Sequence, residues 1–503
     1  MFEDPRDHTT AFVLAGGGTK GSFEVGALQY LIGTERIIPD IITATSAGAI
    51  GAVVLAQART LPEFAHRVQQ MEDDILAMTR TGYVFGEQAW LRALRGTSLG
   101  TEILQALTEG TRPPPPSGVG LARTAGSDRG HERATPTLAG RAPTTEPAQL
   151  SSRAQRRADR RSRRRGRRRV VRLVAGAALR LPRARRRLQT SGSAVMNLQP
   201  LADAMRRGGP SGIHAVDPAL IDRPGLQLRL AVTALRAGVL RYITESGTIV
   251  EEDATTPVAG PAAGPVDILE GALASASVPF VFPPRRLADD DYVDGGVLQN
   301  VPVKAAVHLG ASRIIAVLAI PLRIHREEHD FANEQAANIG LRALGAISLA
   351  ERQRENLAIP LPSEASLATI DPVVDVVGFF EAEVGLLRIN RDYGWLRAAD
   401  VLSPGDPTLR EEIAAQTHQI TEARLRAWHT EEKLWGSSPM GRDSEAGYCA
   451  LLRECKEAIR QLVEQRKQLG FPVPDGCEAW WTEYEIHAGA RPGHLPRQPH
   501  AGD

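Results

Sequence analysis

The first regular pattern in the chain is TAFVLAGGGTKGSFEVGALQYLI, which runs from Thr10 to Ile32. Its first five residues favour a β-strand, three consecutive glycines favour a tight turn, and apolar residues then recur at helical spacing from Ser22. The next pattern, IITATSAGAIGAVVLA from Ile41 to Ala56, repeats this order of strand, turn and small-residue helix. Alternation of this kind predicts an α/β fold with a parallel sheet covered by helices.

Later segments continue the pattern and then change it. Strands are predicted at Leu226–Ala234 and at Arg313–Ala319, and the second has the continuous apolar run of a strand buried on both faces. From about residue 401 the chain is charged and helical, as in Arg410–Trp428 and Glu445–Leu469. We therefore expect a helical C-terminal extension over residues 401–503.

Residues 113–193 interrupt the α/β pattern. They open with Pro113 to Pro116 and contain no Phe, Tyr, Trp, Ile, Lys or Asn. Such a segment has little apolar surface to offset an ordering entropy of ~1–2 kcal/mol per residue. We expect a disordered insertion that divides the α/β domain into residues 8–112 and 194–400.

The net charge of +1 conceals a local imbalance in this insertion. Between Arg153 and Arg187 there are 17 arginines and one acid, Asp159, so this segment carries +16 and the rest of the chain −15. We interpret the Arg-rich segment as a solvated tail. Two alternatives stay open: a patch that binds nucleic acid or anionic lipid through phosphates, and the product of a shifted reading frame in GC-rich DNA. No specific nucleic-acid partner is expected.

Composition and cysteine usage favour a cytoplasmic globular protein. Hydrophobic residues make up 42% of the 503 residues, which excludes a largely disordered chain. Cys449, Cys455 and Cys477 are too few for a disulfide framework and do not pair with histidines at zinc spacing, so we expect a reducing compartment and no metal. The N-terminus has acids where an export signal would be basic. The apolar stretch Ile41–Ala56 is short for a membrane span of ~20 residues.

Ser46 lies in the turn Ala44-Thr45-Ser46-Ala47-Gly48, between a predicted strand and a predicted helix. A serine at such a bend has an exposed hydroxyl, and small neighbours let the strand and helix come close together. The setting is typical of a nucleophile elbow, although Ala44 replaces the first glycine of the usual GxSxG. The alternative is that Ser46 only caps the following helix.

The glycine-rich turn from Gly16 to Gly21 has two possible chemistries. Unpaired N–H groups at a helix N-terminus bind phosphates or stabilise an oxyanion. The string fits GxGxxG, with Glu35 or Asp40 as the acid of a dinucleotide site. It lacks the sequence of a Walker loop. The glycines alone leave the choice open.

A third motif, YVDGGV from Tyr292 to Val297, places Asp294 at the mouth of another glycine turn, before Asn300 and Pro302. A serine hydroxyl needs a base within hydrogen-bond reach to accept its proton. Asp294 could be that base, although an isolated Asp-Gly-Gly is most often only a turn.

These three motifs, in this order, resemble the patatin-like phospholipase family. GGGTKG resembles the family's oxyanion-hole motif, Ser46 its nucleophile and Asp294 the second member of its Ser-Asp dyad. The segments Ala272–Pro284 and Val297–Pro302 extend the resemblance, which covers residues 8–110 and 195–320. It implies a three-layer α/β/α core with a mostly parallel sheet.

The resemblance also implies a reaction: hydrolysis of carboxylic esters of phospholipids or related acyl lipids, without a cofactor. Asp294 accepts the proton as Ser46 attacks the ester, and water activated by Asp294 then hydrolyses the acyl-enzyme. The implied oxyanion hole comprises Gly16, Gly17, Gly18 and Lys20. Lys20 stands where the family more often has Arg, and Lys makes a poorer bidentate contact. The expected partner is an acyl lipid substrate presented at a membrane surface.

Other readings remain. His308, His325 and His329 follow the acid in the chain, as the base of an α/β-hydrolase would; we favour the dyad. The chain could also be a catalytically silent patatin-like protein that binds lipid or a partner, or a binder of anionic polymers through Arg153–Arg187.

Overall fold

The structure is a computed structural model of the chain. The residues it describes are 8–81, 86–87, 194, 196–209, 212–259, 264–288, 290–324, 343, 347–378, 383–403, 406–435 and 442–485. All of these described residues belong to one compact unit. The expected disordered insertion 113–193, its Arg-rich segment, His325 and His329 lie outside the described residues.

The core is a mixed sheet whose main strand order is β11-β10-β1-β2-β5-β6-β7. Five neighbouring strands are parallel: β11 (Ser366–Ile370), β10 (Arg313–Val317), β1 (Thr10–Leu14), β2 (Ile41–Ala44) and β5 (Gln227–Ala234). The antiparallel strands are β6 (Val239–Thr244), β7 (Ile249–Val250), β8 (Arg285–Leu287) and β9 (Asp290–Asp294). The four strands predicted from sequence are confirmed, with Arg313–Ala319 two residues too long.

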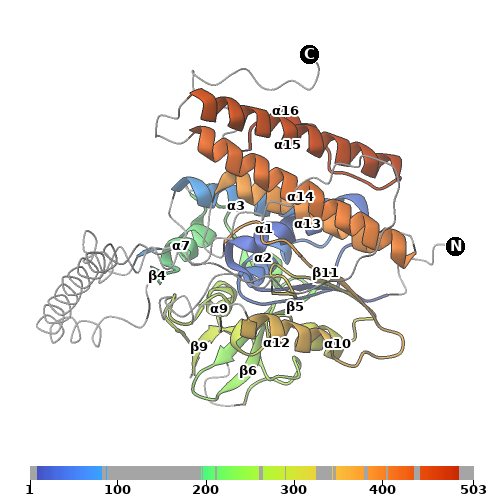
Figure 1. The fold of residues 1–503 in the computed structure, drawn as a ribbon. Helices are drawn as coiled ribbons and strands as arrows, with labels where there is room; N and C mark the ends of the chain where they lie inside the picture. The colour runs from blue at the N-terminus through green and yellow to red at the C-terminus, as the bar shows by residue number, and fades with distance from the viewer. Residues whose placement is uncertain are drawn as a thin grey trace, which may run out of the picture. The chain divides into compact units, whose positions relative to one another are not determined.

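Helices cover both faces of this sheet, because alternate residues of each central strand point to opposite sides. In β1, Phe12 and Leu14 belong to the large apolar core on one face, whereas Ala11 and Val13 belong to a smaller apolar cluster on the other. The first face carries α1 (Ser22–Leu28), α2 (Ala47–Leu55), α3 (Leu61–Thr81), α7 (Gln199–Arg207), α9 (Ile268–Ser275) and α13 (Val384–Leu402). The second carries α10 (Val303–His308) and α12 (Ser348–Leu357). The expected three-layer α/β/α core is confirmed, with α1, α2 and α13 on one side and α10 and α12 on the other (Figure 1).

Two glycines let α1 and α13 cross with their backbones in contact. A Cβ atom on Gly26 would lie 1.7 Å from Arg391 O, and one on Gly394 would lie 1.9 Å from Phe23 O. No side chain fits at either position, so α1 packs against α13 at a fixed, short separation. The glycine turn Gly16–Gly21 leads directly into α1 and is therefore held in place from behind.

The C-terminal region is helical, as predicted. The predicted helix Arg410–Trp428 lies within α14 (Pro407–Trp435), and Glu445–Leu469 corresponds to α15 (Arg442–Gln468). These helices, with α16 (Ala479–Thr482), share a second apolar core that also includes Leu396 of α13. The predicted boundary at residue 401 falls within the last turn of α13; the domain boundaries themselves stay predictions.

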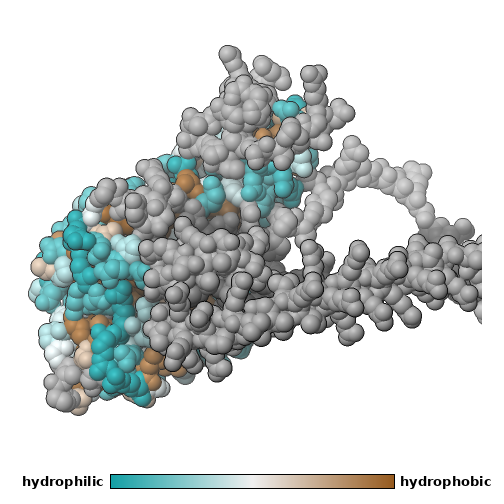
Figure 2. All heavy atoms as spheres, turned by 90° about the vertical axis from the view of Figure 1, so that its left-hand side faces the viewer, coloured by the Kyte–Doolittle hydropathy of each residue, from teal (hydrophilic) through white to brown (hydrophobic). Residues whose placement is uncertain are grey.

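The remaining short elements are α8 (Pro218–Ile221), β3 (Gly86–Glu87) paired with β4 (Met196–Asn197), the π-helix η2 (Gln29–Thr34) that continues α1, and two single turns, η1 (Gly18–Gly21) and η3 (Gly295–Val297). On the face drawn in Figure 2, the described residues are mainly hydrophilic, and the hydrophobic ones form small separate patches. None of the helices described here has both the length and the apolar character needed to cross a membrane.

Candidate active site

Strand register brings Ser46 and Asp294 to the same place. β2 pairs with the first half of β5, where Ala44 lies opposite Leu230. β9 pairs with the second half of β5 on the same side as β2, and Asp294 lies opposite Val232. Ser46 follows Ala44 by two residues, so it leaves β2 at the level of β5 where Asp294 ends β9.

Ser46 has a strained backbone, with φ 57° and ψ −126°. A positive φ is unusual for a residue with a side chain, and such strain of ~1–3 kcal/mol is typically kept at functional sites. The side chain makes no capping hydrogen bond to α2. The capping alternative is therefore wrong, and the turn has the geometry of a nucleophile elbow.

Ser275, at the end of α9, holds this strained turn. The Ser46 backbone N–H donates to Ser275 Oγ at 3.0 Å, and Ser275 Oγ donates to Ala231 O of β5 at 2.7 Å. Ser275 is fully buried. Ser275 lies in the segment Ala272–Pro284 of the family resemblance, which did not predict a role for it. The Ala/Ser-rich composition there was the available signal.

Three hydrogen bonds hold Asp294 in place, two of them with backbone groups of other residues. Its Oδ1 accepts a hydrogen bond from Gly296 N at 2.7 Å, and its own N–H donates to Ser277 O at 3.0 Å. Its carbonyl accepts a hydrogen bond from Thr233 Oγ1 at 3.0 Å. The other carboxyl oxygen, Oδ2, is buried and has no hydrogen-bond partner among the described residues. One oxygen thus positions the group and the other is left for a further donor.

Burial raises the pKa of Asp294 to about 6, and the Ser46 hydroxyl and the Gly296 N–H oppose this rise. Ser46 therefore acts on the carboxyl as a nearby donor, although no hydrogen bond of regular length and angle joins it to Oδ2. The Ser46 hydroxyl and the Asp294 carboxyl lie close together, and a small rotation of either side chain would change the hydrogen-bond angle between them. At neutral pH the carboxyl is mainly ionised and can accept a proton.

The first glycine turn packs directly against Ser46. A Cβ atom on Gly16 would lie 2.6 Å from both Ser46 Cβ and Asn300 Oδ1, so only glycine fits. Asn300 Nδ2 donates to Gly16 O at 3.2 Å and ties the turn to the loop after Asp294. Gly18 has φ 60°. Among the described residues, the N–H groups of Gly16, Gly17 and Gly18 donate no backbone hydrogen bond.

Lys20 lies in the same turn, but its ammonium group is occupied. It forms an ion pair with Asp375, while Thr19 Oγ1 donates to Gly378 O at 2.7 Å. Both contacts hold η1 to the loop after β11. The structure thus gives Lys20 an anchoring contact, and its predicted part in an oxyanion hole stays a prediction.

The acids of the dinucleotide alternative lie elsewhere. Asp40 precedes β2, at the opposite edge of the sheet from the glycine turn, and its Oδ2 accepts a hydrogen bond from Thr10 N at 2.9 Å. Glu35 accepts a hydrogen bond from Tyr30 Oη at 2.6 Å. Neither is placed to bind a ribose next to Gly16. His308 ends α10 on the other face of the sheet, with Nδ1 3.0 Å from Asp253 O.

A comparison with family models matches residues 12–307, more than half of the chain, to the model described as patatin-like phospholipase. The chain belongs to the patatin-like phospholipase family. A comparison with curated proteins finds no match.

Two crystal structures are similar to this patatin-like chain at low scores. VipD from Legionella pneumophila is 14% identical, with 97% of this chain and 93% of that chain covered and a TM-score of 0.28. The type III effector protein ExoU is 12% identical, with 92% and 75% covered and a TM-score of 0.21. The family match supports lipid acyl hydrolase activity in general terms.

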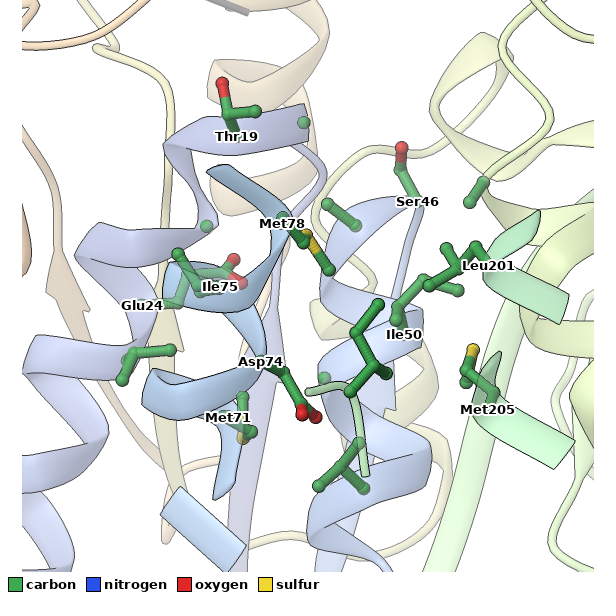
Figure 3. Close-up of a pocket in the computed structure, with 18 of the residues that line it drawn as sticks. Thr19, Glu24, Ser46, Ile50, Met71, Asp74, Ile75, Met78, Leu201 and Met205 are labelled. Atoms are coloured by element: carbon green, nitrogen blue, oxygen red, sulfur yellow. The ribbon is translucent and has the colours of Figure 1, made fainter. Parts of the chain in front are cut away.

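Beside Ser46 the patatin-like domain contains a cavity of about 130 Å³ between α1, α2, α3 and α7. Ser46 and Thr19 lie at one end of the drawn side chains, and Met71 and Asp74 at the other (Figure 3). Most of the wall is apolar, including Ile50, Val54, Ile75, Met78, Leu201, Met205 and Leu387. The apolar wall suits a hydrocarbon chain attached next to Ser46.

Within the described residues, no three His, Cys, Asp or Glu side chains gather as metal ligands would.

Proposed function

We propose that the protein hydrolyses carboxylic esters of phospholipids or related acyl lipids through a Ser46–Asp294 dyad. The observation that carries this proposal is the unpartnered, buried Oδ2 of Asp294 beside the strained Ser46. A base that is fixed through one oxygen and free at the other is what a serine nucleophile needs.

The reaction has two halves. Asp294 accepts the Ser46 hydroxyl proton as Oγ attacks the ester carbonyl, and it returns that proton to the leaving alkoxide when the ester C–O bond breaks. In the second half Asp294 takes a proton from water, which attacks the acyl-enzyme, and returns it to Ser46 Oγ. Each half ends with the carboxylate ionised again.

The glycine turn supplies the electrostatic part. The N–H groups of Gly16, Gly17 and Gly18 are not used by other backbone groups of the described residues, and Gly16 is in contact with Ser46. Such donors, fixed before the reaction, stabilise an oxyanion without reorganisation, and one of them is worth ~3–4 kcal/mol in related sites. Lys20, paired with Asp375, anchors this turn.

The substrate is taken from a lipid surface. Phe280 supports this part: it is 84% exposed and has φ 70°, a conformation that disfavours a large side chain. It lies between Val278 and Phe282, which both line the cavity. An exposed aromatic at the rim of an acyl pocket can enter the headgroup region of a bilayer. A cytoplasmic location, expected from the cysteines, is part of the same proposal; Cys455 and Cys477 are buried thiols.

The experiment is fluorophosphonate labelling of the purified chain, followed by hydrolysis of a panel of acyl esters and phospholipid vesicles. We expect labelling at Ser46 and hydrolysis, both lost in Ser46→Ala. Folding of that variant is checked by its melting temperature. Absence of labelling in the folded wild type would favour the silent lipid-binding alternative.

A further inference from the structure

A buried carboxyl group, Glu24, interrupts the apolar wall of the cavity. Glu24 lies in the first turn of α1 and is 3% exposed. Figure 3 shows it across the cavity from Ser46, with its carboxyl oxygens directed toward the space between them. The crossing of α1 with α13 fixes the depth of this helix, so Glu24 cannot move out to solvent with its backbone.

Glu24 lacks the partners that a buried carboxyl group normally has. Its Oε1 forms no hydrogen bond with any described residue. Burial raises the pKa of Glu24 well above its usual range, and the nearby Ala15 peptide opposes this only in part. Burial therefore favours the protonated form of Glu24, which can both donate and accept a hydrogen bond.

The other acid in the same wall is satisfied. Asp74 Oδ1 accepts a hydrogen bond from the His214 backbone N–H at 2.8 Å and lies 2.8 Å from His214 Nδ1. Asp74 thus closes the far end of the cavity with a partner of its own. Glu24 and Asp74 share the cavity but differ in whether the protein satisfies them.

An unsatisfied buried polar group is costly to the fold, and a ligand atom that satisfies it recovers this cost on binding. A plain hydrocarbon chain in this cavity offers no acceptor and also excludes water from Glu24. A chain with a hydroxyl or oxo oxygen at the right carbon offers one. A site built around such a hydrogen bond discriminates against the analogue that lacks it.

We propose that Glu24 is a specificity residue that selects acyl chains bearing a hydroxyl or oxo oxygen at the carbon that faces it. This rests on the proposed acyl hydrolase function, since it assumes that the chain attached at Ser46 occupies the cavity. The unpartnered Oε1, its burial and its place opposite Ser46 carry the inference.

The test uses p-nitrophenyl dodecanoate and its monohydroxy derivatives, with the hydroxyl moved one carbon at a time. We expect wild-type kcat/KM to peak at one hydroxyl position, about tenfold above the unsubstituted ester. Glu24→Gln keeps a donor and an acceptor and retains most of this preference. Glu24→Leu loses it and hydrolyses the unsubstituted ester at least as fast as the wild type.

Asp74→Asn is the matched control, because it changes an acid in the same wall that already has a partner; its preference should equal that of the wild type. Melting temperature and Ser46 labelling check each variant. No peak in the wild type, or an unchanged peak in Glu24→Leu, would overturn the inference.

Calorimetry separates this inference from the proposed function. In Ser46→Ala, the methyl ester with the favoured hydroxyl should bind about tenfold more tightly than the unsubstituted one, and Glu24→Leu in that background should abolish the difference. Binding preference without hydrolysis in the wild type would refute the hydrolase and keep the role of Glu24. Hydrolysis without a binding preference would keep the hydrolase function and refute the role of Glu24.

Discussion

Asp294 and Asp392 are both buried aspartates, with 5% and 4% exposure, yet their surroundings are opposite. Asp392, on α13, accepts hydrogen bonds from Arg424 Nη1 at 2.7 Å and Trp480 Nε1 at 2.9 Å, and it also pairs with Arg391. Burial acts to raise the pKa of Asp392, but Arg391 and Arg424 outweigh it and hold the pKa below its usual range.

Among the described residues no cation offsets the burial of Asp294, and its pKa is raised to about 6. The difference shows what each region does. Charges that are fully paired hold α13 against α14 and α16, whereas a carboxyl left with a free oxygen next to a hydroxyl is available for proton transfer. Burial alone does not distinguish the two sites; the partners do.

Removing the base should have the largest effect. We expect Asp294→Asn to lower kcat/KM by at least about 10³-fold, since loss of one member of a catalytic unit typically has this size. The amide keeps an oxygen for Gly296 N, so the fold should persist. Steady-state hydrolysis and the melting temperature check both points; near-normal activity would contradict the dyad.

Breaking the paired region should instead reduce stability. Asp392→Asn removes the carboxylate that Arg391 and Arg424 share, although each keeps a second acid, Glu72 and Glu485 respectively. We therefore expect the free energy of unfolding to fall, but by less than the ~3–5 kcal/mol lost when a buried ion keeps no partner. Urea denaturation measures it. Glu457→Gln, in an exposed pair with Arg460, is the control and should change nothing measurable. Equal effects of the two variants would show that the buried network has no special role.

The titration of Asp294 should be visible in two readouts. A carboxyl whose folded pKa is raised favours the fold at low pH, and this contribution is lost as pH rises from about 4 through about 6. Its size is on the order of 3 kcal/mol. Over the same range kcat/KM should rise. Asp294→Asn should therefore be more stable than the wild type at pH 8 and not at pH 4, as measured by denaturation at each pH.

Ser275 should have an intermediate effect. Ser275→Ala leaves the Ser46 N–H without an acceptor, at a cost of ~1–3 kcal/mol, and loosens the strained turn. We expect a fall of about tenfold or more in the rate of fluorophosphonate labelling. Ser277→Ala is the matched control, since Ser277 follows α9 and its Oγ donates to Leu273 O of that helix and not to the Ser46 turn. Similar rates in both variants would refute the positioning role.

His308 should matter least. Its ring is exposed at the end of α10 and faces the Asp253 carbonyl. His308→Ala should keep kcat/KM within about twofold of the wild type, because the base of the dyad needs no imidazole. A loss comparable with that of Asp294→Asn would replace the dyad by a histidine mechanism.

The sequence was sufficient for the central elements of the fold, and the roles of Ser46 and Asp294 stay predictions. Glycine turns, β-rich runs and helical spacing are local signals, and β1 and β2 begin and end at the predicted residues. The contacts that hold the site are not local. Ser275 reaches Ser46 across 229 residues, and Asn300 reaches Gly16 across 284. The pairing of both β2 and β9 with β5 could not be predicted either, because the hydrophobic pattern of a strand does not show which strand it pairs with.

The place of β1 in the sheet has a consequence for synthesis of the chain. β1 leaves the ribosome well before one of its two neighbours, β10, which begins only at Arg313. Until then the apolar β1 has an unpaired edge, which is open to association with other chains. A product that stops after Asp294 would carry both dyad residues and still lack this strand, so we expect it to aggregate instead of acting as a smaller enzyme.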